Sequence, residues 1–308
     1  MRNAFADEVT ALAKSNSKVV LLSGDIGNKL FDKFKEVDER RFYNCGVAEA
    51  NMMGVAAGMA LSGLRPVIYT ITPFTTTRCF EQIRVDACYH KAPVVIVGTG
   101  SGLSYAELGP THHSLEDLAI LRTLPGMRVM APCDATEMRL ALRAALHEDG
   151  PVYIRIGKKG EPKIHQQEPD FKIGRAIVVQ EGTDVALLGA GTIMPAVLAA
   201  AALLKAQGIS AEVASFHSIK PLDTGYLNSA AKKFKLLATI EEHGLIGGLG
   251  GAVSEWRSSA DVRISQISVG TPDEFMHEIG SQDYARAKFG LTAENITKRV
   301  VGALQNRQ

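Results

Sequence analysis

Short apolar runs alternate with helical patterns through the first half of the chain. Five runs rich in β-branched residues predict strands, and the spacing of apolar positions between them predicts helices. The predicted strands are Lys18–Leu22, Arg65–Thr70, Pro93–Val97, Met127–Ala131 and Pro151–Arg155. The predicted helices are Ala4–Ala13, Glu49–Leu61, Thr76–Tyr89, Ser114–Leu121 and Ala135–Leu146. Apolar strands separated by helices indicate a parallel sheet that is covered on both faces.

The second half of the chain repeats this alternation. Its predicted strands are Asp184–Leu188, Ala211–Ser215, Lys235–Ile240 and Val262–Val269, and a helix starts near Pro195. Between the halves, residues 157–174 are polar and interrupted by prolines, which is typical of a linker. We therefore expect an α/β protein of two domains, each a mostly parallel sheet flanked by helices. The expected boundaries are 1–160 for the first domain, 161–175 for the linker and 176–308 for the second domain.

Composition and charge exclude several classes of protein. The 308 residues include 34 Lys and Arg against 33 Asp and Glu, so a polybasic nucleic-acid arm is excluded as the main function. The longest apolar run, Ala196–Leu204, is too short to cross a membrane, and acidic residues stand where a secretion signal would be apolar. The four cysteines, Cys45, Cys79, Cys88 and Cys133, form no CxxC pair, which favours reduced thiols over a disulfide framework or a zinc site. We expect a cytoplasmic protein with no nucleic-acid or membrane partner.

Two glycine-rich stretches do not match nucleotide-binding motifs. Residues 189–194 follow a strand and precede a helix, but they lack the third glycine and the downstream acid of the dinucleotide fingerprint. A tight turn is the favoured interpretation, and a nicotinamide-dependent dehydrogenase is disfavoured. Residues 247–251 lack the Lys and Ser/Thr of a phosphate-binding loop, so they predict close packing at a helix start.

The segment 23–29 and the helix that begins at Glu49 are the first candidate sites. Ligands of parallel sheets gather beyond the carboxyl ends of strands, which is where Asp25 lies, although the residues alone slightly favour a helix cap or turn residue. Beyond Asn51 the helix carries no charged residue, so we expect it to be buried in a core or at a subunit interface. Glu49 is the only acid at its start. It either stabilises the helix dipole or, isolated among apolar groups, handles protons in its uncharged form, and the residues alone do not decide between these roles.

Two further segments follow predicted strands. Phe74 falls in a strand-to-helix loop, where a ring can stack on a flat ligand, whereas Phe80 falls on the next helix; core filling is the commoner explanation for both. Residues 98–118 form a long loop, and long ordered loops are uncommon without a function. His112 and His113 close this loop before a helix that Ser114 is expected to cap. The histidine pair is a poor metal site because no third ligand is evident nearby.

In order along the chain, the motifs GD, GVAEANMMGVAAGMA, TPFTTTRCFEQIR and GPTHHSLEDL closely resemble the pyrimidine-binding domain of transketolases. The second half resembles their C-terminal domain, including the stretch Ile240–His243, so the resemblance covers essentially the whole chain. Transketolases bind the diphosphate of thiamine diphosphate through Mg²⁺ with a GDG motif and a downstream Asn, and Gly24–Gly27 is not that motif. The resemblance therefore implies the C-terminal subunit of a split transketolase. The diphosphate and the metal would be held by a separate N-terminal subunit, in an α₂β₂ assembly.

The resemblance also implies how this chain contacts the cofactor. Glu49 matches the glutamate that binds a ring nitrogen of the aminopyrimidine, where a protonated carboxyl promotes the imino tautomer. Phe74 is the best match to the stacking aromatic residue. Phe80 is the alternative, because the alignment contains an inserted residue. Asp25 matches a cofactor-contacting aspartate, and Ile26 matches the bulky residue beside the cofactor. No residue of this chain is expected to bind the metal.

Substrate contacts are implied in the same way, with two departures. His112 matches a histidine that binds a substrate hydroxyl. Lys158 aligns with a phosphate-binding arginine, and Lys29 stands at a phosphate-contacting serine position, so an anionic substrate end is expected. Gly100 replaces a substrate-binding histidine, and Leu108 replaces an aspartate that contacts a sugar hydroxyl. We therefore expect an unusual or modified ketose rather than the common pentose phosphates.

The resemblance predicts transfer of a two-carbon ketol unit from a ketose to an aldose. Another thiamine-dependent enzyme is the alternative: a relative of 1-deoxyxylulose-phosphate synthase, or a 2-oxoacid dehydrogenase β subunit, against which GPTHH argues. A non-catalytic scaffold or regulatory subunit that kept the fold is a third hypothesis.

Overall fold

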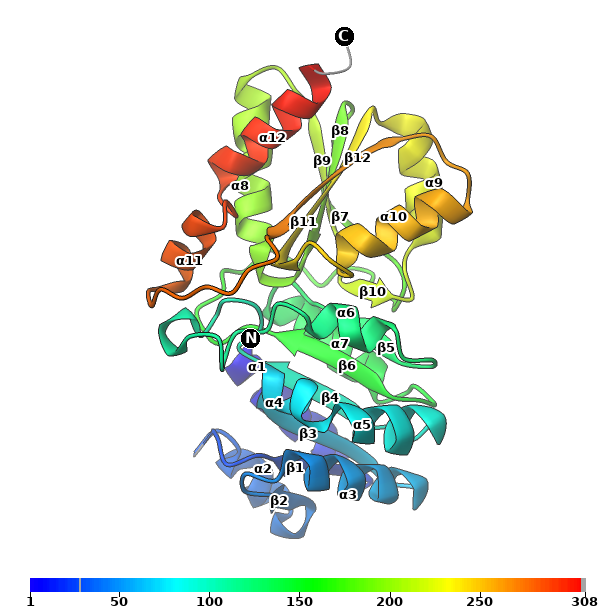
Figure 1. Cartoon of the computed structure of the whole chain (residues 1–308). Helices are drawn as coiled ribbons and strands as arrows, with labels where there is room; N and C mark the ends of the chain where they lie inside the picture. The colour runs from blue at the N-terminus through cyan, green and yellow to red at the C-terminus, as the bar shows by residue number, and fades with distance from the viewer. Residues whose placement is uncertain (28, 306–308) are drawn as a thin grey trace.

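A seven-stranded sheet forms the centre of the first half of the chain in the computed structural model, which describes residues 1–27 and 29–305 (Figure 1). Its strand order is β10-β5-β6-β4-β3-β1-β2, and all neighbouring pairs are parallel except β10 with β5. The strands are β1 (Val19–Ser23), β2 (Phe42–Asn44), β3 (Arg65–Ile71), β4 (Val95–Thr99), β5 (Arg128–Met130), β6 (Val152–Ile156) and β10 (Ser218–Lys220).

Helices cover both faces of this sheet, as its apolar strands require. Side chains alternate along a strand, so Val20 and Leu22 of β1 pack into the core cluster beneath α3, while Val19 and Leu21 pack into the cluster beneath α1 and α7. The helical elements of this half are α1 (Arg2–Ser15), α2 (Asp32–Val37), η1 (Glu39–Arg41), α3 (Glu49–Leu61), α4 (Thr72–Thr75), η2 (Thr77–Cys79), α5 (Phe80–Gln82), η3 (Ile83–Tyr89), η4 (Ala106–Leu108), α6 (Asp117–Arg122) and α7 (Ala135–Ala145).

The second half forms a five-stranded sheet with the order β12-β11-β8-β9-β7, in which only β7 is antiparallel. Its strands are β7 (Ile177–Gln180), β8 (Val185–Ala190), β9 (Ala211–Ser215), β11 (Leu236–Gly244) and β12 (Ser265–Thr271). Its helical elements are η5 (Gly191–Ile193), α8 (Met194–Ala206), α9 (Thr224–Lys233), α10 (Leu249–Ser259), α11 (Gln282–Lys288) and α12 (Ala293–Gln305). The predicted α/β fold with two mostly parallel, helix-flanked sheets is confirmed.

The two halves are joined through strand β10 and a shared core. Residues 218–220 come from the second half, yet they pair with β5 and complete the first sheet. One hydrophobic cluster contains Leu121 of α6, Ile219 of β10 and Trp256 of α10. The domains are therefore packed on each other rather than tethered, and Figure 1 shows β10 between them. The boundaries at residues 160 and 175 stay a prediction.

Two local predictions were wrong. The segment predicted as one helix, 76–89, is broken into η2, α5 and a π-helical stretch, and Phe74 lies in the short helix α4 rather than in a loop. Hydroxyls of Thr76 and Thr77 donate to the carbonyl oxygens of Thr72 and Pro73 at 2.8 Å each, and such bonds compete with regular helix.

The helix predicted to begin at Ser114 begins at Asp117 instead, with Glu116 at its N-cap position. Ser114 cannot cap it because its backbone is bonded to Gly102, with Ser114 N–H donating to the Gly102 carbonyl at 3.0 Å. Both glycine-rich stretches adopt the predicted structures, a tight turn in one and the start of a helix in the other. Gly191 turns the chain between β8 and α8, and residues 247–251 lead into α10.

Helix α3 is buried on one face only. Met52, Met53 and Ala56 are buried in the core, while Val55 and Leu61 are 41% and 58% exposed in the single chain. The helix was expected to be buried either in a core or at a subunit interface. One face does lie in the core, and the other is exposed and apolar, as a subunit interface requires. Across residues 1–27 and 29–305, no helix combines the length and apolar character that crossing a membrane would need.

Candidate active site

Segments that follow four neighbouring strands meet at one edge of the first sheet. The strand order places β1, β3, β4 and β6 side by side and parallel. Asp25 follows β1, Phe74 follows β3, the loop 100–116 follows β4, and Lys158 follows β6. Because the carboxyl ends of parallel strands share an edge, segments far apart in the sequence line one surface.

Glu49 lies at the first position of α3 and is 5% exposed. The sequence suggested that Glu49 is isolated among apolar groups, but the structure gives it a charged partner. Arg78 of η2 donates from Nη1 to Glu49 Oε1 at 3.0 Å, and the Arg78 guanidinium carbon lies 3.8 Å from the centre of the Phe74 ring. The arginine was overlooked because η2 and α3 are brought together only by folding. The carboxylate thus lies between a guanidinium and the start of a helix.

The ring contacts continue from Phe74 to Lys158. The Phe74 ring meets His112 edge-on, with 5.3 Å between centroids, and His112 lies 6.0 Å from Tyr105 in the same manner. The Lys158 ammonium is 4.4 Å from the centre of the Tyr105 ring. Glu49, Arg78, Phe74, His112, Tyr105 and Lys158 thus form one continuous strip of contacts, which we call the active-site strip.

His112 is held for hydrogen bonding in its neutral form. The Thr111 hydroxyl lies 2.9 Å from Nδ1, so Nε2 is the nitrogen left for a ligand. Burial lowers the pKa of His112, and the positive charge of Arg78 acts in the same direction. At pH 7 the imidazole is therefore uncharged and can accept or donate one hydrogen bond at Nε2.

Gly100, which the resemblance matched to a histidine position, is required by the geometry of this chain. Gly100 has φ +72°, a conformation that glycine adopts without strain, and a Cβ there would collide with the Tyr105 ring. Tyr105 therefore fills the space in front of Gly100. Leu108, at the other departure, lies at the end of η4 with 48% of its surface exposed.

Lys158 has an unexpected partner. Its ammonium forms an ion pair with Glu107 of η4, and the side chains are 26% and 46% exposed. The hydrogen bond from Lys158 lowers the pKa of Glu107. The sequence analysis did not identify Tyr105 or Glu107 as site residues, because no pattern in the loop distinguishes them. Folding places Tyr105 against Gly100 and Glu107 against Lys158.

The remaining predicted residues have other contacts. Asp25 is exposed and accepts a hydrogen bond from Asn44 at 3.2 Å, and Ile26 packs against the core beneath α1. Phe80 packs against the core beneath α3, whereas Phe74 contacts Arg78, the partner of Glu49. Lys29 is exposed.

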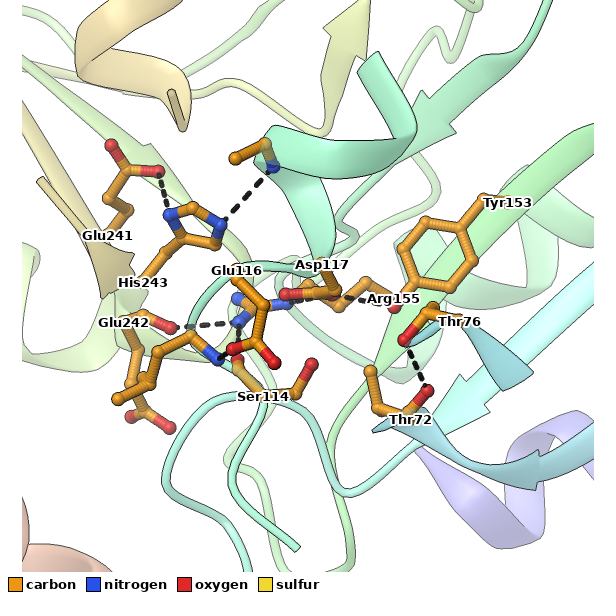
Figure 2. Close-up of polar contacts among 12 residues, drawn as sticks. Thr72, Thr76, Ser114, Glu116, Asp117, Tyr153, Arg155, Glu241, Glu242 and His243 are labelled. Atoms are coloured by element: carbon orange, nitrogen blue, oxygen red, sulfur yellow. Dashed lines mark hydrogen bonds and ion pairs between the residues drawn. The ribbon is translucent and has the colours of Figure 1, made fainter. Parts of the chain in front are cut away.

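A buried charged network holds the loop 100–116 in place (Figure 2). Arg155 of β6 donates from Nε to Asp117 at 2.8 Å, and from Nη2 to the carbonyl oxygens of Ser114 and Glu242 at 2.9 and 2.8 Å. The Tyr153 hydroxyl also donates to Asp117, at 2.6 Å. Both members of the ion pair are at most 1% exposed. The network thus ties the end of the loop to β6 and to the second domain.

The second domain holds the start of the same loop through Glu242. The Leu103 backbone N–H donates to Glu242 Oε1 at 2.6 Å, and Gln282 and Arg286 of α11 also donate to this carboxylate. A side chain at Gly102 would collide with Glu242, so glycine is needed for this close approach. The stretch 240–243 therefore supports the site from the neighbouring domain.

Two family models match the chain. The pyrimidine binding domain of transketolase matches residues 1–162, and the transketolase C-terminal domain matches residues 174–296. The chain belongs to the transketolase family. This family depends on thiamine diphosphate, and membership supports a transferase role.

Several transketolase subunits are similar to the chain over nearly their whole length. A subunit of the apulose-4-phosphate transketolase from Phocaeicola vulgatus is 34% identical over 96% of this chain and 95% of its own. The 6-deoxy-6-sulfo-D-fructose transketolase subunit SqwH from Clostridium sp. (strain MSTE9) is 36% identical over 97% and 92%. A solved structure described as a split gene transketolase, inactive beta4 tetramer, superposes with a TM-score of 0.91, 37% identity and coverage of 99% and 98%.

An enzyme named for a different activity is also similar to the chain. The 1-deoxy-D-xylulose-5-phosphate synthase from Methylacidiphilum infernorum is 35% identical over 98% of this chain, which spans 48% of that enzyme. The transketolase subunits match the chain end to end, whereas the synthase contains an additional half.

Proposed function

We propose that this chain is the C-terminal subunit of a heteromeric, thiamine-diphosphate-dependent transketolase that transfers a two-carbon ketol unit from a ketose to an aldose. The observation that carries the proposal is the contact of a buried helix-start carboxylate, Glu49, with a planar cation that stacks on Phe74. The end-to-end similarity to subunits of other transketolases supports the same function.

The residues around Glu49 suit an aminopyrimidine. The Arg78 guanidinium is flat, carries N–H donors, stacks on Phe74 and donates to Glu49. An aminopyrimidine ring protonated at its ring nitrogen would need the same two contacts, one to a carboxylate and one to an aromatic face. We infer that Arg78 moves aside when the cofactor binds, and that Glu49 and Phe74 then hold the ring. Asp25 and Ile26 are proposed to contact the cofactor from the end of β1.

When bound, the cofactor supplies an electron sink that allows a ketose to be cleaved beside its carbonyl group. Glu49 would hold and exchange a proton at the pyrimidine ring nitrogen, with its position fixed by the start of α3. Nε2 of the neutral His112 would bind a substrate hydroxyl. Tyr105, standing in front of Gly100, would form the pocket wall where related enzymes place a histidine.

We propose that Mg²⁺ and the cofactor diphosphate are held by an N-terminal partner subunit, because the sequence lacks the GDG motif for that task. The exposed apolar face of α3, with Val55 and Leu61, is proposed to lie within an α₂β₂ assembly. Cytoplasmic localisation is also proposed, on the ground that all four cysteines are free.

A 1-deoxyxylulose-phosphate synthase activity is the second candidate, because one such enzyme is 35% identical over 98% of this chain. The two functions differ in their donor, which is pyruvate in the synthase reaction and a ketose in ketol transfer.

The proposed function is tested by mixing the chain with its N-terminal partner, thiamine diphosphate and Mg²⁺. We expect aldehyde release from a ketose only when all four are present, and a light-scattering mass of two copies of each subunit. Full activity of the chain without a partner would contradict the split site. Pyruvate decarboxylation faster than ketose cleavage would favour the synthase, and no turnover of either donor would favour a scaffold.

Glu107→Gln is expected to improve the use of ketoses that end in phosphate or sulfonate. In the folded chain Glu107 pairs with Lys158, so an anionic substrate must compete for that ammonium. Because the pair is partly exposed, we expect KM for the anionic ketose to fall about threefold to fivefold, with kcat little changed. KM for a neutral ketose should stay constant.

The matched control for this variant is Glu278→Gln, which breaks an exposed Lys–Glu pair with Lys288 away from the active-site strip. Steady-state kinetics with both ketoses measures the difference. A KM for the anionic ketose that rises in the Glu107 variant would show that Lys158 is not its binding group.

A further inference from the structure

Three buried side chains from separate segments meet where the two domains join. Cys133 follows β5, Glu137 lies in the first turn of α7, and His165 lies in the stretch between the domains. His165 Nε2 is 2.7 Å from Glu137 Oε1 and 3.8 Å from Cys133 Sγ. All three ligand atoms lie within 4.8 Å of one another, and each residue is buried. We call this group the junction cluster.

The junction cluster offers a thiol, an imidazole and a carboxylate, which are the donor groups of protein zinc sites. Zinc bonds of about 2.0–2.3 Å place tetrahedral ligand atoms roughly 3.3–3.7 Å apart. The observed separations of 2.7 and 3.8 Å fall on either side of that range, so small side-chain movements would suffice. Spacing along the sequence argued against a metal site, because His165 is 32 residues from Cys133 and only folding brings them together.

Surrounding hydrogen bonds fix the ligands in position. The second oxygen of Glu137, Oε2, accepts from the Cys133 backbone N–H at 2.8 Å and from the Ser215 hydroxyl at 3.1 Å. Asp134 accepts from the backbone N–H of His165 at 3.0 Å. Metal sites commonly hold a ligating carboxylate through its other oxygen in this way, which orients the ligand before the metal binds.

A fourth donor lies beside the cluster. His217 is fully buried, and its Nε2 has no hydrogen-bond partner among the described residues, although a buried ring nitrogen normally has one. It lies near the cluster, since its carbonyl oxygen accepts from the Ala131 backbone N–H at 2.7 Å and Ser215, two residues before it, bonds to Glu137. This orphaned nitrogen is an observation independent of the three-residue geometry, and it points to a missing ligand.

We propose that Cys133, Glu137 and His165 bind one Zn²⁺ ion, with His217 as the fourth ligand. The ion would join α7, the connecting stretch and the second domain, and it would be structural because four protein ligands leave no open position. A thiolate and a carboxylate balance the charge of the metal, so the buried site would be neutral. The site is independent of the proposed ketol transfer.

Zinc binding must displace protons from the junction cluster. Burial, with the charges of Glu137 and Asp134, raises the pKa of the Cys133 thiol. Burial opposes the charge of His165, but the hydrogen bond to Glu137 and the charges of Glu137 and Asp134 together outweigh it and raise the pKa of His165. Burial likewise opposes ionisation of Glu137, but its hydrogen bonds to His165 and the Cys133 backbone, together with the effect of the two histidines, lower the pKa of that carboxyl. Burial lowers the pKa of His217, so that ring is neutral.

The ion therefore replaces one proton on Cys133 and one on His165, and both protons go to solvent.

The test is a titration of the purified full chain with Zn²⁺ and with Co²⁺ after treatment with a chelator. We expect one equivalent of zinc by elemental analysis, a rise in melting temperature with zinc, and a thiolate-to-cobalt absorption band. Cys133→Ser should abolish the band, and His165→Gln should weaken zinc binding at least 100-fold while keeping a hydrogen bond to Glu137.

Cys88→Ser and His90→Gln are the matched controls, since Cys88 is another buried thiol and His90 an exposed imidazole. Both should bind zinc like the unmodified chain. If Cys133→Ser does not fold, the His165 variant and the cobalt spectrum of the unmodified chain still decide. A chain that binds less than a tenth of an equivalent of zinc, or a cobalt spectrum without a thiolate band, would overturn the proposal.

Discussion

Glu49→Gln is expected to lower ketol-transfer turnover by about 10²–10⁴-fold, which is the range for loss of a positioned proton-transfer group. Gln keeps the size of the side chain and can still accept a hydrogen bond, but it cannot exchange a proton with the cofactor ring. Cofactor affinity measured by calorimetry should therefore change far less than turnover, by about tenfold or less. That split between binding and turnover separates a proton-handling role from simple anchoring.

The control for this change is Glu81→Gln, because Glu81 is an exposed acid of α5 whose partner is Arg84. It should leave turnover within twofold of the unmodified enzyme. A Glu49 variant with similar turnover would support the scaffold hypothesis and remove the main argument for catalysis by this subunit.

Arg78→Met tests the same proposal by removing the cation that contacts Glu49 and Phe74. Arg78 occupies the two contacts proposed for the aminopyrimidine, so its removal should strengthen cofactor binding, seen as a lower Kd in the same calorimetric assay. Weaker binding would instead show that Arg78 contacts the bound cofactor.

Arg155→Met is expected to cause the largest loss of stability, about 3–5 kcal/mol. The substitution leaves the carboxylate of Asp117 buried without its counter-ion, and it frees two carbonyl oxygens that Arg155 satisfies. The melting temperature should fall by roughly 10 °C, as measured by calorimetry or circular dichroism. Because the network holds the loop that carries His112, KM for the ketose should also rise.

Arg122→Met is the matched control for Arg155→Met. Its pair with Glu255 lies at the surface, where the carboxylate is 65% exposed, so we expect a loss of at most about 1 kcal/mol. Adding Asp117→Asn to Arg155→Met should restore part of the lost stability by removing the uncompensated charge. A melting temperature for Arg155→Met within 2 °C of the unmodified chain would contradict the importance of the network.

The sequence by itself determined the α/β architecture and the edge of the sheet where the candidate site lies. Strands such as Ala211–Ser215 and helices such as Glu49–Leu61 were predicted with their observed bounds, because apolar periodicity is a local property. The segments of Phe74 and His112 were expected at that edge because each follows a predicted strand, whereas Lys158 was implied by the resemblance alone.

Only the tertiary structure decided which groups these residues contact. The ion pair of Glu49 with Arg78, the Tyr105 ring in front of Gly100 and the pairing of Lys158 with Glu107 join side chains that have no fixed spacing along the chain. Strand β10 is three residues long and carries no periodic signal, yet it completes the sheet of the other domain. Such partners are selected by packing between distant segments, which a pattern read along one chain does not contain.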